Sequence, residues 1–182
     1  MNNLSPDTDE NLRYPVGRYK APAVIDSQTR EAWIAEIERL PANLRELTAG
    51  LSEARLDSPY RPGGWTVRQV VHHLADSHLN SYTRFRLALT EETPSIKAYN
   101  EAAWAELADA RSAPQELSLS LLQGLHARWT ILLRHMTDED FARTLQHPEL
   151  GEIRLDWMLG LYAWHCRHHT AHVAGLRSRE GW

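Results

Sequence analysis

Apolar residues recur three and four positions apart along four long segments of the chain, a spacing that places them on one face of an α-helix. The four segments are residues 27–51, 66–89, 112–136 and 155–179. Two of them open with a capping box, in which a hydroxyl side chain is followed three residues later by glutamine: Thr66 with Gln69, and Ser112 with Gln115. The pattern therefore predicts four amphipathic helices, with the second starting at Thr66 and the third at Ser112.

Prolines mark the boundaries and weak points of these helices, because proline lacks the backbone N–H that a helix interior needs. Pro6, Pro15 and Pro22 lie close together near the N-terminus, so residues 1–26 are predicted to form an extended arm. Pro41 lies inside the first apolar segment, and we expect it to kink or split that helix. The helical part of the chain is expected to begin only after the arm.

The stretches between the long helices are short and polar. A small polar helix is expected near residues 102–110, and residues 137–154, which contain Pro148 and Gly151, are expected to form a loop with room for a small hairpin. No alternating apolar run is long enough to require a larger sheet. The predicted fold is therefore all-α: one four-helix bundle over residues 27–182, preceded by the arm.

Composition agrees with a single soluble domain. The 182 residues, 42% of them apolar, are enough for one core and too few for two. The net charge of −4 comes from scattered side chains, which form no basic surface for nucleic acid or for an anionic membrane. No apolar run is long enough to span a membrane and no secretory signal is visible, so we expect a cytoplasmic protein.

Histidine and tryptophan are the unusual residues, with 10 and 7 copies. The tryptophans at helical spacing are expected in the core or at a subunit contact: Trp33, Trp129 and Trp157. The histidines without a neighbouring histidine are interpreted as surface residues: His126, His135 and His147. Cys166 has no second cysteine to pair with, and we interpret it as a small buried apolar residue.

Four histidines lie within the segment WHCRHHTAHV of the fourth helix. At about 100° per residue, His169 falls inside the apolar arc of that helix and His165 about 20° past its edge. His172 falls about 40° past the edge and His168 about 80° past it. His165 and His169 are therefore the pair nearest the bundle interior, and their i and i+4 spacing suits one divalent ion.

A third ligand has to come from another helix, because histidines spread over two turns cannot all contact one ion. The second helix offers His72, His73 and His78. Periodicity favours His78, which lies on the apolar stripe, whereas the other two fall about 60° to 100° beyond its edges. A buried histidine is more often a hydrogen-bonded core residue than a ligand, but two stacked ones without an acidic partner are costly to bury without a metal. HExxH, a Gly-rich phosphate loop and GxSxG are all absent.

The sequence resembles the YfiT group of the DinB-like superfamily, whose members are named as metal-dependent hydrolases. The resemblance extends over nearly the whole length, from NLRYPVGRYK through GGWTVRQVVHHLADSH and LLQGLHARWTILLR to GLYAWHCRHHTAHV and the terminal Trp182. It implies a four-helix bundle of the DinB/YfiT type, one divalent metal per subunit and a homodimer. Zinc is the expected ion and nickel the alternative.

The resemblance also assigns the metal ligands. The family uses one histidine of the second helix, directly before the leucine of HHLADSH, and two histidines of the fourth helix, which correspond to His73, His165 and His169. The assignment of His73 depends on the resemblance alone, because His73 lies off the apolar stripe. Where the wider superfamily often has HRGQI, this chain has HTAHV, so His172 replaces a glutamine and its role stays open.

Three functions are compatible with such a site. A metal with three neutral ligands and an open position activates water, which predicts a hydrolase of a small-molecule substrate. The resemblance extends to relatives of this fold linked to small thiols, so the first alternative is a bacillithiol-type S-transferase with a thiol cosubstrate. The second is a metal-stabilised binding module in which Cys166 or His172 closes the coordination shell. Asp76 lies within one turn of His73. It has two interpretations: a group that orients an imidazole or acts as a base, or a solvated acid on the helix surface. No catalytic residue is assigned.

Overall fold

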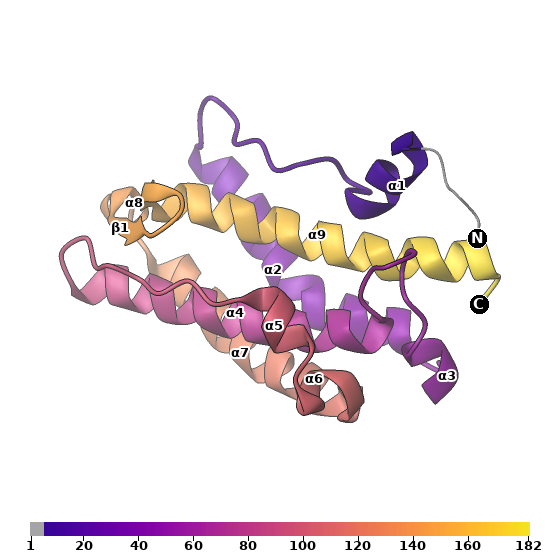
Figure 1. Cartoon of the computed structure of the whole chain (residues 1–182). Coiled ribbons are helices and arrows are strands. Elements are labelled where there is room, and N and C mark those ends of the chain that lie inside the picture. Colours follow the sequence, from indigo (N-terminus) through magenta and orange to yellow (C-terminus); the bar gives the residue numbers. More distant parts are fainter. Residues whose placement is uncertain (1–5) are drawn as a thin grey trace.

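The computed structural model of the protein describes residues 6–182, which consist mainly of helices (Figure 1). The long helices are α2 (Ser27–Thr48), α4 (Val67–Thr90), α7 (Gln115–His135) and α9 (Leu155–Glu180). The shorter elements are α1 (Pro6–Arg13), α3 (Glu53–Leu56), α5 (Glu101–Ala105), α6 (Ala108–Ser112), α8 (Asp138–Ala142), β1 (Thr144–His147) and β2 (Gly151–Arg154). The predicted helical bundle is therefore confirmed, with a two-stranded hairpin at one end.

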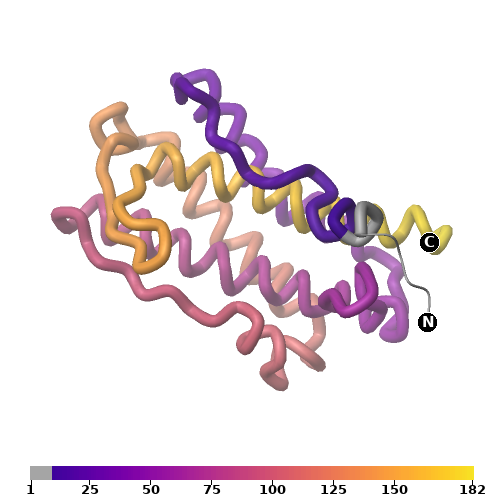
Figure 2. Tube along the Cα trace, turned by 45° about the horizontal axis from the view of Figure 1, so that its top comes forward, coloured from indigo at the N-terminus to yellow at the C-terminus, as the bar shows by residue number. Residues whose placement is uncertain are grey.

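The four long helices pack in the order α2, α9, α4, α7 around the bundle. α2 contacts α9 and α7, and α4 contacts the same two helices. Helices that follow one another along the chain, α2 with α4 and α7 with α9, therefore occupy opposite corners (Figure 1 and Figure 2). As a result α4 and α9, which carry most of the histidines, are direct neighbours.

The core lies between these helices and consists of large apolar side chains. Its fully buried members include Ile37, Leu40, Leu44, Leu74, Phe85, Leu122, Trp129, Leu133, Leu155, Met158 and Leu159. Trp33 and Trp157 are partly exposed and pack against this core, so the tryptophans at helical spacing lie in or against it. Burial of apolar area of this kind is the main stabilising contribution to folding. None of the helices in the described part of the chain is long and apolar enough to cross a membrane.

The start of α4 follows the sequence prediction, whereas the start of α7 does not. Thr66 Oγ1 accepts a hydrogen bond from the backbone N–H of Gln69, whose side chain accepts one from the Thr66 N–H, so the predicted capping box is confirmed. Ser112 is instead the last residue of α6, and its hydroxyl donates to the Ala108 carbonyl oxygen. The predicted start at Ser112 is therefore wrong, because this hydroxyl serves the preceding helix and α7 begins only after Pro114.

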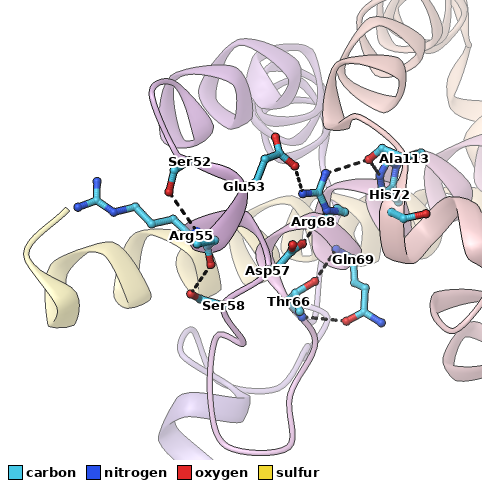
Figure 3. Close-up of polar contacts among 12 residues, drawn as sticks. Ser52, Glu53, Arg55, Asp57, Ser58, Thr66, Arg68, Gln69, His72 and Ala113 are labelled. Atoms are coloured by element: carbon cyan, nitrogen blue, oxygen red, sulfur yellow. Dashed lines mark hydrogen bonds and ion pairs between the residues drawn. The ribbon is translucent and has the colours of Figure 1, made fainter.

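A buried arginine fixes the first turn of α4 (Figure 3). The Arg68 side chain is 3% exposed, and its guanidinium donates to the carboxylates of Glu53 and Asp57. It also donates to the Ala113 carbonyl oxygen. The same oxygen lies 3.1 Å from Nε2 of His72, which follows Arg68 by one turn of α4. These contacts tie α4 to the connection between α6 and α7 and so set the position of the histidines that follow on α4.

Pro41 does not split α2, which runs unbroken from Ser27 to Thr48. Because proline has no N–H, the carbonyl oxygen of Ile37, four residues earlier, lacks its helical partner. The imidazole of His126 on α7 takes that place, with Nδ1 2.6 Å from the Ile37 oxygen. Of the two predicted effects of Pro41, a kink or a split, the split is therefore wrong, since a hydrogen bond from a neighbouring helix replaces the missing one.

The N-terminal arm runs along α9 and is only partly extended (Figure 1). Residues 6–13 of the arm form helix α1, so the prediction of an extended arm over residues 1–26 is wrong for this part. Residues 1–5 of that prediction lie outside the described residues. Trp164 Nε1 donates to the Gly17 carbonyl oxygen at 2.9 Å, and the Tyr19 hydroxyl donates to the Trp157 carbonyl oxygen at 3.1 Å. The arm thereby covers a face of α9 that points away from the core.

The connections contain more structure than the sequence predicts. Helix α8 lies in the predicted loop over residues 137–154 and begins at a capping box of Thr137 with Asp140. The expected hairpin follows it, with Leu145 of β1 opposite Ile153 of β2. The small polar helix expected near residues 102–110 is two short helices, α5 and α6.

Gly160 lies where α9 meets the arm and α2, and the site has no room for a side chain. A Cβ added there would lie 2.4 Å from the Tyr19 hydroxyl and 2.7 Å from the Trp33 ring. We expect Gly160→Ala to lower the free energy of unfolding by about 1–3 kcal/mol, as overpacking does. Gly124→Ala in α7 is the matched control, because a Cβ there meets nothing within 4 Å. The free energy of unfolding of Gly124→Ala should rise by up to about 1 kcal/mol. If urea unfolding gave the two variants equal stability, the close packing around Gly160 would be contradicted.

Candidate metal centre

Three histidines from two helices meet where α4 faces α9. They are His73 of α4 and His165 and His169 of α9, and their ligand nitrogens lie within 4.8 Å of one another. His73 Nε2 lies 3.2 Å from His165 Nε2. Nitrogens bound about 2.1 Å from one tetrahedral ion are about 3.4 Å apart, so this spacing fits a divalent ion. The structure thus brings together the three residues that the family resemblance selects.

All three imidazoles are in the neutral form that metal binding requires. Burial lowers the pKa of His73 to about 4. Burial also holds the pKa values of His165 and His169 well below the ordinary 6.5. Neighbouring imidazoles lower all three values further, because a second positive charge in the cluster would be repelled. At neutral pH each ring therefore offers a lone pair.

His78, the α4 histidine that periodicity favours as a ligand, lies behind this trio. It is fully buried, and its Nε2 lies 3.1 Å from His165 Nδ1. His73, five residues earlier, is the α4 histidine whose ring contacts both His165 and His169. Position on the apolar stripe therefore marks the histidine closest to the bundle centre, whereas the trio lies nearer the edge between α4 and α9.

The interpretation of the isolated histidines as surface residues is wrong for one of them. His126 is 1% exposed, because the Ile37 carbonyl oxygen left free by Pro41 gives its ring a buried hydrogen-bond partner. His135 is exposed and His147 is half-buried. The signal that was available in the sequence is Pro41 itself, since a proline inside a helix always leaves one carbonyl oxygen without its usual donor.

The other two histidines of α9 pack beneath the arm. His172 Nε2 lies 3.1 Å from the Arg13 carbonyl oxygen. His168 stacks on Trp164 with ring centroids 4.5 Å apart and is 7% exposed, although helical phase places it furthest from the core. The ligand nitrogens of His168, His169 and His172 also lie within 4.8 Å of one another, so a second group shares His169 with the first.

Two cavities adjoin the trio. One, of about 460 Å³, is lined by all three histidines and by aromatic side chains that include Trp65 and Trp164. The other has a volume of about 650 Å³. Glu101, Ala102 and His165 line both cavities. Either volume is large enough for a small organic molecule next to the ligand nitrogens.

Known proteins resemble this chain over most of its length. Residues 36–173 match the model of the DinB superfamily. The chain belongs to the DinB superfamily. It is 53% identical over 176 residues to the "Putative metal-dependent hydrolase YfiT" of Bacillus subtilis (strain 168), with 96% of this chain and 99% of that protein covered. A "Putative metal-dependent hydrolase" of Bacillus cereus (strain 03BB102) is 52% identical over 172 residues, with 94% of this chain and 99% of that protein covered.

Two solved structures of four-helix bundles also match the chain. The structure of YfiT from Bacillus subtilis matches with a TM-score of 0.92 at 53% identity, and the match covers 94% of this chain and 99% of that chain. It is described as having "an unusual four-helix bundle topology". The four-helix bundle protein TT2238 matches with a TM-score of 0.54 at 21% identity, over 85% of this chain and 100% of that chain, and shares the fold alone. The DinB/YfiT-type bundle predicted from the sequence is therefore confirmed.

Two further candidates, Cys166 and Asp76, are close in sequence to the trio of this DinB-superfamily protein. Cys166 is buried, which raises the pKa of its thiol, and it lines a separate small cavity together with Glu36 and Arg39 of α2. This supports its interpretation as a small buried apolar residue. Asp76 is half-buried, and burial raises its pKa to about 6. Among the described residues, no hydrogen bond joins its carboxylate to His73.

Proposed function

We propose that this protein is a divalent-metal-dependent hydrolase of a small-molecule substrate, with His73, His165 and His169 as the metal ligands. The observation that carries the proposal is the convergence of three neutral imidazoles at the wall of a cavity of about 460 Å³. When bound, a divalent ion supplies a Lewis acid that brings the pKa of water to about 7. Zinc is the proposed ion, with nickel as the alternative. The names of the Bacillus relatives support the same activity.

The side chains around the trio favour a catalytic site over a closed structural one. Cys166, a candidate fourth ligand, lines a cavity on the α2 side of α9. His172 donates through Nε2 to the Arg13 carbonyl oxygen, and its other ring nitrogen lies 3.4 Å from His169 Nδ1. Neither is placed between the three ligand nitrogens, so a coordination position is left for water or substrate. The indole of Trp65, with its ring centroid 4.6 Å from that of His73, forms part of the wall of the same cavity.

The test compares chelated protein, zinc-reloaded protein and zinc-treated His169→Ala on a panel of esters, amides and phosphoesters. We expect the zinc-reloaded wild type to hydrolyse at least one class of substrate and the other two preparations to be inactive. His168→Ala is the matched control and should keep its activity. Equal hydrolysis by the chelated and the reloaded wild type would contradict the proposal.

A second candidate function is the metal-dependent transfer of a small thiol to an electrophile. One observation favours it: the cavity of about 650 Å³ shares His165 with the first cavity, so two organic molecules have room beside the same ligand. A hydrolase needs room for one organic substrate, whereas a transferase needs room for two. Mass spectrometry of the products distinguishes the two functions after zinc-loaded protein is incubated with bacillithiol and an electrophilic acceptor. A thiol conjugate would favour the transferase, and a hydrolysis product without conjugate the hydrolase.

A further inference from the structure

A continuous row of hydrogen-bonding groups crosses the bundle and ends at the trio. The Ile37 carbonyl oxygen of α2 lies 2.6 Å from His126 Nδ1. His126 Nε2 lies 3.0 Å from His78 Nδ1, and His78 Nε2 lies 3.1 Å from His165 Nδ1. His126 and His78 are 1% and 0% exposed. The row therefore connects α2, α7, α4 and α9 through the interior of the bundle.

The position of each proton in this row follows from its first member. A carbonyl oxygen only accepts, so His126 carries its proton on Nδ1, which makes its Nε2 an acceptor. His78 then donates from Nδ1, and its Nε2 accepts a proton from His165 Nδ1. Three protons for three rings leave every ring neutral. The lone pair of His165 therefore lies on Nε2, the atom that is 3.2 Å from His73 Nε2.

We infer that His126 and His78 are positioning residues, which set His165 in the tautomer whose Nε2 lone pair faces the metal position. The inference rests on the proposed metal site. Histidine ligands commonly donate their second ring N–H to a carboxylate or carbonyl group that fixes their orientation. Here two imidazoles stand between the ligand and a backbone carbonyl oxygen. Pro41 is the origin of the row, because its missing N–H leaves the Ile37 oxygen available to His126.

Aromatic side chains keep the two positioning rings in their planes. Trp129 and Tyr162 contact His78 edge-on, with centroid distances of 5.8 and 5.2 Å. His78 in turn stacks on His126 at 4.9 Å. Tyr162 is fixed by its own hydroxyl, which donates to the Ser77 carbonyl oxygen at 3.2 Å. Rotation of His78 would break both of its hydrogen bonds, so the tautomer of His165 is coupled to the packing of the core.

The direct test reads the tautomers of the wild-type protein by long-range ¹H–¹⁵N NMR, with and without zinc. We expect the proton on Nδ1 in His126, His78 and His165 in both samples. A proton on Nε2 of His126 or His78 would overturn the inference. This measurement needs no variant and no activity. If the wild type bound no zinc, the proposed function would fail, whereas the tautomer assignment would still be decided by the metal-free spectrum.

The consequence for metal binding is tested with His126→Phe, which keeps an aromatic ring and removes both hydrogen bonds. We expect the zinc affinity to fall about 10- to 100-fold and His165 to lose its preference for the Nδ1 proton. His135→Phe is the matched control, since it makes the same change at an exposed position of the same helix and should leave zinc affinity unchanged. A folded His126→Phe with wild-type zinc affinity would overturn the inference.

Discussion

Alanine at His73, His165 or His169 is expected to remove the bound metal, whereas alanine at His168 leaves it in place. Each of the first three supplies one of the ligand nitrogens that lie within 4.8 Å of one another. Changing a group that merely orients a ligand typically costs 10- to 100-fold in affinity, so the loss of a ligand itself should cost more than about 100-fold. The three variants should therefore lose most of their zinc during dialysis.

His168→Ala is a close control for His169→Ala. The two residues are adjacent on α9, of the same type, and 7% and 6% exposed, so loss of a buried imidazole is common to both variants. Metal analysis after dialysis checks the difference. Equal zinc loss in the two variants would contradict the assignment of the ligands and would favour the second group, formed by His168, His169 and His172.

Acidification of the metal-free protein below pH 6.5 is expected to lower its free energy of unfolding steeply. Burial lowers the pKa values of His126 and His73 to about 4, whereas histidine in an unfolded chain has a pKa of about 6.5. Between these pH values the unfolded chain binds protons that the folded chain does not. The contribution of these two histidines to the free energy of unfolding is therefore complete above pH 6.5 and is lost as the pH falls towards 4. At about 1.4 kcal/mol per pH unit, His126 alone accounts for about 3 kcal/mol.

Asp76 and Glu101 act in the opposite direction, because burial raises the pKa of each carboxyl group, that of Asp76 to about 6. These two carboxyl groups are outnumbered by the buried histidines. Urea unfolding at pH values of about 7.5 and about 5.5, with a chelator present, measures the net effect. Zinc-loaded protein is the comparison, and it should keep its stability to a lower pH because bound metal favours neutral imidazoles. Equal unfolding midpoints of the metal-free protein at the two pH values would contradict the prediction.

The long helices are predictable because each carries an apolar stripe, most of which the bundle buries. The exceptions at the start of α7 are Leu117 and Leu121, which are exposed. Helices α1 and α8 are not predictable, since they have 8 and 5 residues and no such stripe. Ser112 shows a related limit. A capping motif satisfies backbone groups locally, but the sequence does not say whether the hydroxyl ends one helix or begins the next.

Part of the site is predictable for the same reason. Helical phase selects His165 and His169, because the inward face of α9 is set by its own apolar residues. Phase cannot select His73, since the stripe of α4 points to the bundle centre, where His78 lies. The family resemblance supplies that residue instead.

The remaining site residues depend on contacts between distant segments. His168 is buried because Trp164 and the N-terminal arm cover it, with the Tyr14 ring 5.8 Å from its own. His126 is buried because a carbonyl oxygen of another helix is available to it. No local pattern encodes either contact. Helical phase therefore places His168 away from the core, and the lack of a neighbouring histidine leads to His126 being interpreted as a surface residue.

Cobalt substitution tests most directly whether His73, His165 and His169 bind one ion and leave a position open. The visible spectrum of Co²⁺ reports the number of ligands and their exchange. We expect one cobalt per chain and a spectrum that changes when azide or a small thiol is added, because these ligands occupy the open position. A spectrum that no small ligand alters, together with a fourth protein atom in the coordination shell, would contradict a catalytic centre and leave a metal-stabilised binding module.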